Sequence, residues 1–110
     1  MKNKVQNGGA ITVIAPYAVF SGQGVQVGGL FGVAACDAVQ GSAVEIERMG
    51  VYDITALQTD TGNPGAKIYW DNTARRLTTT ATNNTVVGCL TAAKTASDTA
   101  ARVLLDGVVR

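Results

Sequence analysis

The sequence of 110 residues contains no histidine. Histidine is the commonest general base in enzymes and a frequent metal ligand, so its absence excludes a Ser-His-Asp triad and a Cys-His pair. The only two cysteines, Cys36 and Cys89, are too few to close a zinc site. Both stand among small apolar residues, and we expect buried free thiols. The sequence therefore offers no catalytic residue, no metal ligand set and no cofactor.

Charge of one sign and long apolar runs are also scarce. The net charge is +1, from nine basic and eight acidic residues spread along the chain. A nucleic-acid-binding protein would gather Lys and Arg on one face, whereas the only basic doublet, Arg75-Arg76, is expected to be a pair of solvated strand residues. No apolar run approaches the ~18 residues of a membrane span, and no apolar segment follows the first residues as in a signal peptide. We therefore expect that the protein binds no nucleic acid, does not enter a membrane, and is synthesised in a reducing cytoplasm.

Small and β-branched residues dominate what is present. The chain has 16 Ala, 14 Val, 13 Thr and 13 Gly but only six aromatic residues. This composition favours short strands and tight turns over a helical bundle. We expect an all-β fold, a compact small β-barrel or β-sandwich with at most one short helix. A flexible N-terminal arm, residues 1–9, would precede a single domain, residues 10–110. So many small side chains make a thin core, so association through an apolar surface is expected.

Short β-rich runs recur at roughly 8–12-residue spacing, which is typical of sandwiches and barrels. In the run over residues 43–54, Val44 and Ile46 should point inward and Glu45 and Glu47 outward, before a bend at Gly50. Residues 92–101 are compatible with one or two helical turns or with a loop. The other expected strands are residues 10–14, 17–20, 25–27, 30–35, 85–91 and 99–105.

Residues 65–82 read as a β-hairpin that carries the only tryptophan. Period-2 alternation places Ile68 and Trp70 on one face and Lys67 and Tyr69 on the other, and Asp71-Asn72-Thr73 supplies turn chemistry. Trp70 is expected to anchor either the core or a subunit interface, since tryptophan is enriched in both.

Two patterns that suggest chemistry have simpler explanations. Glu45 and Glu47 share a strand face about 7 Å apart, a separation compatible with a glycosidase pair, but no aromatic set forms a pocket around them. The glycine-rich stretches at residues 22–28 and 62–67 lack the spacing and the following helix of a phosphate-binding loop. We interpret both as structural: a solvated strand face and turn glycines.

The sequence also contains a weak internal echo. Residues 31–34 (FGVA) lead through a small-residue loop to residues 44–46 (VEI), and residues 87–90 (VGCL) lead through another to residues 102–104 (RVL). Two related half-barrels would produce this pattern, and so would chance.

The order of several segments resembles a known family. A polar arm with Val5-Gln6 is followed by ITVIAPYAVFSGQGVQVGGLFGVA, VEIERMGVYDI, GAKIYWD, VVGCL and RVLLDG. This order is similar to that of small head decoration, or cement, proteins of tailed bacteriophages, over nearly the whole chain and most specifically at residues 16–34 and 65–71. Members have sometimes been labelled predicted recombinases of the RecA/RadA type. The sequence does not support that label, because it has no Walker A loop.

The resemblance implies a structural virion protein without enzymatic activity. It would sit on the outer capsid surface as a homotrimer and bridge subunits of the major capsid protein, after synthesis in the bacterial host. Alternatives are a small β-barrel binding module for carbohydrate or a host surface, with exposed aromatics around Tyr69 and Tyr17, or an enzyme or DNA-recombination factor.

An arm suited to adding a strand to a capsid sheet comprises Lys2, Asn3, Lys4, Val5, Gln6 and Asn7. Subunit-interface candidates are Tyr69, Trp70, Arg75 and Arg76.

Overall fold

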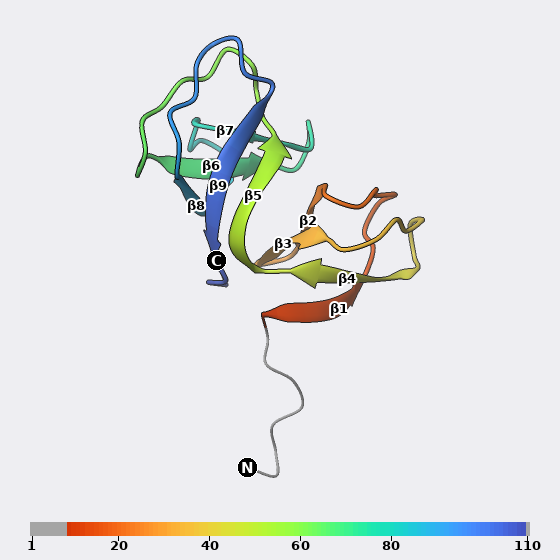
Figure 1. Cartoon of the computed structure of the whole chain (residues 1–110). Coiled ribbons are helices and arrows are strands. Elements are labelled where there is room, and N and C mark those ends of the chain that lie inside the picture. Colours follow the sequence, from red (N-terminus) through yellow and green to blue (C-terminus); the bar gives the residue numbers. More distant parts are fainter. Residues whose placement is uncertain (1–8, 110) are drawn as a thin grey trace, which may run out of the picture.

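The computed structural model describes residues 9–109, and these residues form two antiparallel β-sheets with no helix (Figure 1). The expected all-β fold class is confirmed. Without a helix, the described part of the chain also holds no helical segment able to cross a membrane. The strands are β1 Ala10–Ile14, β2 Gly24–Val27, β3 Leu30–Ala34, β4 Ala43–Glu47, β5 Met49–Thr55, β6 Lys67–Asp71, β7 Arg76–Thr78, β8 Thr85–Leu90 and β9 Ala100–Asp106.

The first sheet has the strand order β1-β4-β3-β2 and is built from the N-terminal half of the chain. Its strands alternate as the sequence predicts: on β4, Val44 and Ile46 are buried while Glu45 and Glu47 are exposed. Val44 and Ile46 pair with Val13 and Ile11 of β1, so the apolar positions of neighbouring strands fall on the same face.

The second sheet has the order β5-β9-β8-β6-β7 and contains the predicted hairpin as β6 and β7. Ile68 and Trp70 are fully buried, whereas Lys67 is exposed and Tyr69 half-buried. The turn is the expected Asp-initiated type. The Asp71 Oδ1 atom accepts hydrogen bonds from the amides of the second and third residues after it, at 2.9 and 3.1 Å.

Three local predictions were wrong. Residues 17–20 form a loop held by one isolated bridge, Val19 to Ala38. The run over residues 43–54 divides at Arg48 into β4 and β5, which belong to different sheets, while Gly50, with a φ of 120°, lies inside β5. Residues 92–99 form a loop, which is one of the two alternatives that the sequence left open. Cys36 is exposed and Cys89 only half-buried, although both are free thiols as expected. Both cysteines follow apolar residues, but Cys36 lies where β3 has already ended.

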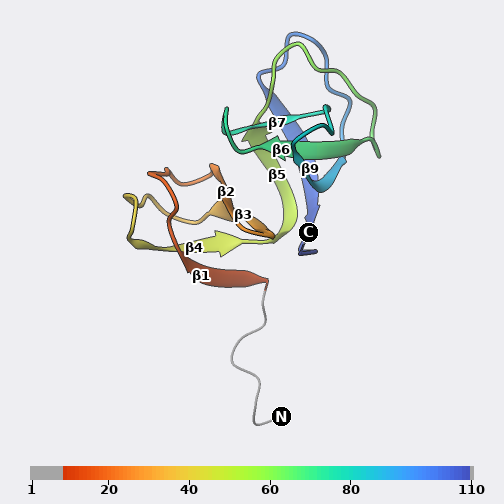
Figure 2. The same ribbon diagram turned by 180° about the vertical axis from the view of Figure 1, so that it is seen from behind.

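Each sheet buries its own apolar cluster, and the two clusters meet at β3. Trp70, 2% exposed, lies in the cluster of the second sheet together with Val33 of β3. Its ring packs against Phe31 of β3 with centroids 5.0 Å apart. Gly24 of β2 leaves room for this ring, because a Cβ atom there would lie 2.7 Å from it. In both views the two sheets occupy separate halves of the molecule, joined by the passage from β4 to β5 (Figures 1 and 2).

The two halves share one topology, with β7 as an addition to the second. In each half the first strand pairs with the last, and the remaining strands follow in reverse order. Equivalent backbone hydrogen bonds close both loop regions. In the first half these bonds run from Gly22 N to Ala34 O (2.9 Å), from Ala34 N to Gln23 O (2.9 Å) and from Ala35 N to Glu45 O (2.9 Å). Their equivalents in the second half, in the same order, run from Gly65 N to Leu90 O (2.7 Å), from Leu90 N to Ala66 O (2.9 Å) and from Thr91 N to Arg102 O (3.0 Å).

This correspondence gives the sequence echo a structural meaning. Residues 31–34 and 87–90 are equivalent as the echo aligns them, but its second part is displaced by one residue, since Glu45 corresponds to Arg102. The bridge between Val19 and Ala38 likewise corresponds to that between Gly62 and Lys94. An origin by duplication stays a hypothesis; the shared architecture allows one half to be compared with the other.

Candidate binding surfaces

An arginine stacked on a tyrosine joins the two halves of the molecule. The guanidinium carbon of Arg75 lies 3.5 Å from the centre of the Tyr17 ring. Arg75 follows the Asp71 turn, with its backbone in the left-handed region at a φ of 59°. Its amide donates to the Asp71 carbonyl at 2.7 Å, and its Nε donates to the Asn72 carbonyl at 3.3 Å. These contacts fix the side chain over the ring although it is exposed to solvent.

The tyrosine beneath is fixed in turn by a partly buried polar network. Tyr17, only 8% exposed, donates from its hydroxyl to Asn72 Oδ1 at 3.2 Å and accepts from the Gln26 amide at 3.1 Å. The same Asn72 oxygen accepts from the indole nitrogen of Trp70 at 3.0 Å. The network therefore connects the core tryptophan to the surface arginine. Beside it lies a hollow of about 240 Å³ that both Arg75 and Phe20 line.

A second hollow, of about 270 Å³ and mostly apolar, opens on the other side of Phe20. It lies between the loops that follow β1 and β3, where Phe20 is 66% and Val39 67% exposed. Burial of apolar area is the main source of protein association. Large apolar side chains this exposed, next to each other, indicate a surface for a partner. We call Arg75, Phe20, Val39 and the two hollows the loop surface.

The equivalent loops of the second half are closed by a buried lysine. Lys94, which corresponds to Ala38, is only 4% exposed. Its ammonium group donates to the carbonyls of Gln58 (3.1 Å), Asp60 (2.7 Å) and Thr95 (3.3 Å). Where the first half has an open hollow, the second therefore has a cross-link between its two loops.

The carboxylate of Asp60 extends this lysine-centred clasp to β7. It accepts from the Thr78 hydroxyl at 2.6 Å and from the Thr79 amide at 2.8 Å. Burial pushes the pKa of Asp60 up, but those hydrogen bonds and the charge of Lys94 outweigh it and hold the pKa below its ordinary value. The ionised carboxylate is thus part of the native loop structure.

This lowered pKa predicts loss of stability in acid. A carboxyl group whose pKa is lower in the folded chain stabilises the fold above its unfolded pKa of about 3.9, and the contribution is lost as the pH falls through the folded pKa. We expect the thermal midpoint to hold from pH 7 to about pH 4 and to drop below it. Asp60→Asn should flatten this drop, whereas Asp53→Asn, at an exposed ion pair, should change it little. An acid drop of wild-type steepness in Asp60→Asn would contradict the assignment.

The outward face of the second sheet carries further exposed apolar side chains. Val51 of β5 and Leu104 of β9 are register partners and are 54% and 41% exposed. Next to them a hollow of about 300 Å³ is lined by Leu104, Cys89 and Lys67, among others. The solvent face of an antiparallel sheet is normally polar, so this apolar area is unusual. We call it the sheet surface.

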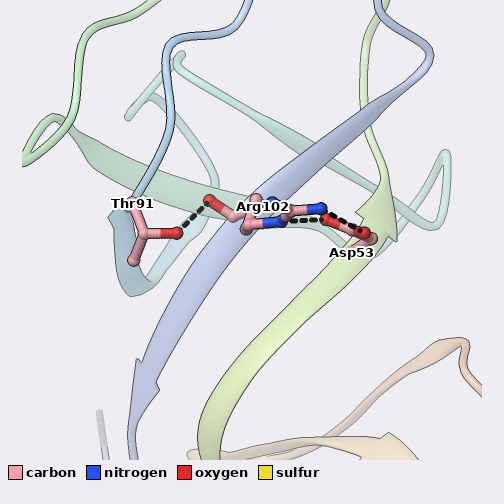
Figure 3. A network of polar contacts seen from close by, with 3 residues as sticks. All are labelled: Asp53, Thr91 and Arg102. Carbon is pink, nitrogen blue, oxygen red and sulfur yellow. Dashed lines mark hydrogen bonds and ion pairs between the residues drawn. The ribbon is translucent and has the colours of Figure 1, made fainter.

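Farther along the same strands the outward face becomes polar. Arg102 of β9 forms a bidentate ion pair with Asp53 of β5, with distances of 3.0 and 3.2 Å (Figure 3). The hydrogen bond from Arg102 holds the pKa of Asp53 below its ordinary value. Thr91 lies on the other side and donates to the Arg102 carbonyl at 3.5 Å. Both charged side chains are 58% exposed, so the pair contributes little stability and serves to bound the sheet surface.

One comparison with known proteins decides the family. The family model described as "Phage cement protein" matches residues 5–105. The chain belongs to the phage cement protein family. No curated protein and no solved structure matches it. The sequence-based identification is confirmed, and membership indicates a structural role in the phage capsid.

The structure distributes the predicted interface residues of this cement protein over different environments. Arg75 belongs to the loop surface, and Tyr69 lies half-buried on the outward side of β6. Trp70 is in the core, the first of its two expected roles; its indole nitrogen donates to Asn72, and it also lines the hollow beside Arg75. Arg76 lies partly buried in β7. The arm candidates Lys2, Asn3, Lys4, Val5, Gln6 and Asn7 lie outside the described residues.

Sequence reasoning did not single out several residues that define these surfaces. Phe20 and Lys94 stand in loops without a motif. The sequence assigns Asn72 only to the hairpin turn, and Tyr17 only to a set of exposed aromatics. No local signal pairs Tyr17 with Arg75, since the contact depends on how the two sheets meet. Within residues 9–109 no group of three or more His, Cys, Asp or Glu side chains could hold a metal ion.

Proposed function

We propose that the chain binds the outer surface of the assembled phage head and stabilises it by bridging neighbouring major capsid subunits. The observation that carries this proposal is the presence of two separate apolar-bearing surfaces on one small domain. The loop surface belongs to the first half, and the sheet surface to the second. A protein that bridges neighbouring subunits as an oligomer needs one surface for the capsid and one for its own copies.

Self-association as a homotrimer would strengthen this action. Packaged DNA pushes the shell outward, and a rigid module across a seam adds contact area between subunits. Once one protomer of a trimer is bound, the other two bind as if intramolecularly, so modest individual contacts give high avidity. Permanent interfaces between identical chains are more apolar than interfaces between proteins that associate only transiently. The apolar sheet surface around Val51 and Leu104 suits this role.

The N-terminal arm supplies a further contact in this proposal. A polar segment can add a strand to an exposed sheet edge of the capsid, with affinity from backbone hydrogen bonds and little demand on side chains. The arm would then contribute through its backbone, and the charges of Lys2 and Lys4 would matter less.

Binding to heads that lack this protein tests the proposal. The purified chain should have the native mass of three protomers and bind saturably to expanded heads of its own phage. Deletion of residues 1–9 should weaken binding about tenfold or more, the loss of one anchoring contact. The double variant Lys2→Gln with Lys4→Gln, the matched control, should keep most of it. Absence of wild-type binding would overturn the capsid role; full binding by the deletion would overturn the arm mechanism.

The alternative of a carbohydrate or host-surface module receives no support from the aromatic side chains. It needs exposed rings around Tyr69 and Tyr17, on which a sugar could stack. Tyr17 is 8% exposed and covered by Arg75, and Tyr69 is half-buried on a different element. Glycan binding by the purified chain would revive it.

A further inference from the structure

Arg75 is held in a fixed position on the loop surface. Its ring stacking and its Nε hydrogen bond fix the guanidinium plane, yet the left-handed backbone that places it is uncommon for an arginine. Among residues 9–109 the other non-glycine residue with positive φ is Asn83, a type that tolerates this conformation. Strain of this kind is retained mostly at functional sites. Within residues 9–109 the terminal nitrogens of Arg75 form no hydrogen bond or ion pair.

The natural partner of a fixed guanidinium is a carboxylate, and the chain's own carboxylates are nearly all engaged. All eight acidic side chains lie within residues 9–109, and among these residues only Glu45 of β4 receives no hydrogen bond. The other seven accept hydrogen bonds within the chain: Asp37 from Ser21, Glu47 from Tyr52, Asp53 from Arg102, Asp60 from Thr78, Asp71 from Thr73, Asp98 from Thr95 and Asp106 from Val108. Charge complementarity therefore points to an acidic group on another molecule.

Phe20 adds an apolar contact beside this charge. It lines the hollow that it shares with Arg75 and also the apolar hollow beside Val39. In the equivalent loops of the second half, the Lys94 cross-link spans the corresponding position. The loop surface thus combines one fixed cation with two hollows beside it. Such a combination of polar and apolar groups is typical of non-obligate interfaces, whose partners also exist as separate proteins.

We propose that the loop surface is the capsid-binding site, where Arg75 forms a bidentate pair with a carboxylate of the major capsid protein and an aliphatic side chain beside that carboxylate fills the hollow at Phe20. This assignment rests on the proposed function and gives it a location. Arginine and aromatic residues dominate the binding energy of such contacts. The sheet surface is left for association between copies of this chain.

Three substitutions test the site, and a fourth is the control. Arg75→Gly removes the guanidinium and with it the contact to the Tyr17 ring, but it suits the left-handed backbone, so the two effects partly offset each other and the thermal midpoint should stay within about 5 °C of wild type. Phe20→Ser removes an exposed side chain. Arg75→Lys keeps the charge but loses the fork geometry. Arg76→Lys is the matched control. Binding of each full-length variant to expanded heads without this protein is measured by cosedimentation over a protein concentration series, with native mass measured in parallel.

The expected result is a weakening of head binding by about tenfold or more for Arg75→Gly, a several-fold loss for Arg75→Lys and Phe20→Ser, and no change for Arg76→Lys. Native mass should be the same in all variants. If the wild type binds heads and Arg75→Gly binds equally well, the site assignment is wrong while the proposed function stands. If Arg75→Gly or Phe20→Ser lowers the native mass, the loop surface holds a second copy, which also overturns it. Heads that fail to bind the wild type refute the proposed function itself.

Discussion

Replacing Gly88 with alanine is expected to destabilise the protein by about 3 kcal/mol or more, enough to unfold much of a marginal domain. Gly88 lies inside β8, paired with Ile68 on one side and with Leu105 on the other. A Cβ atom there would lie 1.9 Å from the carbonyl oxygen of Leu104. Because both neighbouring strands are hydrogen-bonded, the backbone cannot move away without breaking the ladder. Urea unfolding curves of wild type and variant measure the effect.

Two other glycines calibrate this prediction. Gly32 is the equivalent position in the first half, and its Cβ would lie 2.8 Å from the carbonyl oxygen of Glu47, a smaller overlap. Gly9 has nothing within 4 Å of its Cβ and serves as the control. The losses should rank Gly88→Ala above Gly32→Ala, with Gly9→Ala close to wild type. A Gly88→Ala variant as stable as Gly9→Ala would show that β8 and β9 do not pack this closely.

The sequence predicts the local parts of this fold but not how the strands are divided between the two sheets. Alternation identified β4 and the hairpin of β6 and β7 correctly, because period-2 burial is a local property. The sequence gives no comparable signal for the change of sheet between β4 and β5. That change depends on Arg48 and on which strands pair, a long-range outcome. The weak echo becomes clear only when equivalent hydrogen bonds align the two halves.

The candidate binding surfaces were predictable to a smaller extent. Arg75 was an interface candidate because it followed the hairpin turn, whereas its partner Tyr17 lies in a loop of the other half. Phe20 and Val39 come from two loops that adjoin only through the bridge at Val19. Surfaces assembled from loops of different strands leave no periodic pattern, so sequence reasoning finds their members singly.

Replacing Lys94 with methionine is expected to lower the free energy of unfolding by about 2 kcal/mol or more, since three carbonyl oxygens lose their common donor. Methionine keeps the approximate length of the side chain, so lost packing contributes little. The same change should also raise the pKa of Asp60 towards its ordinary value, because the charge of Lys94 helps to keep it low. The acid drop in thermal midpoint should therefore be shallower than in wild type, in addition to the lower midpoint at pH 7.

The matched control is Lys67→Met, which removes the same charge from an exposed position on β6. It should leave the free energy of unfolding within about 0.5 kcal/mol of wild type. If the two variants behave alike, the ammonium of Lys94 does not hold the loops and the clasp is not a structural element. If only Lys94→Met is destabilised, the two halves differ as the structure indicates: an internal cation closes the loops of the second half, while the equivalent loops of the first half, with Ala38 in that place, stay open for a partner.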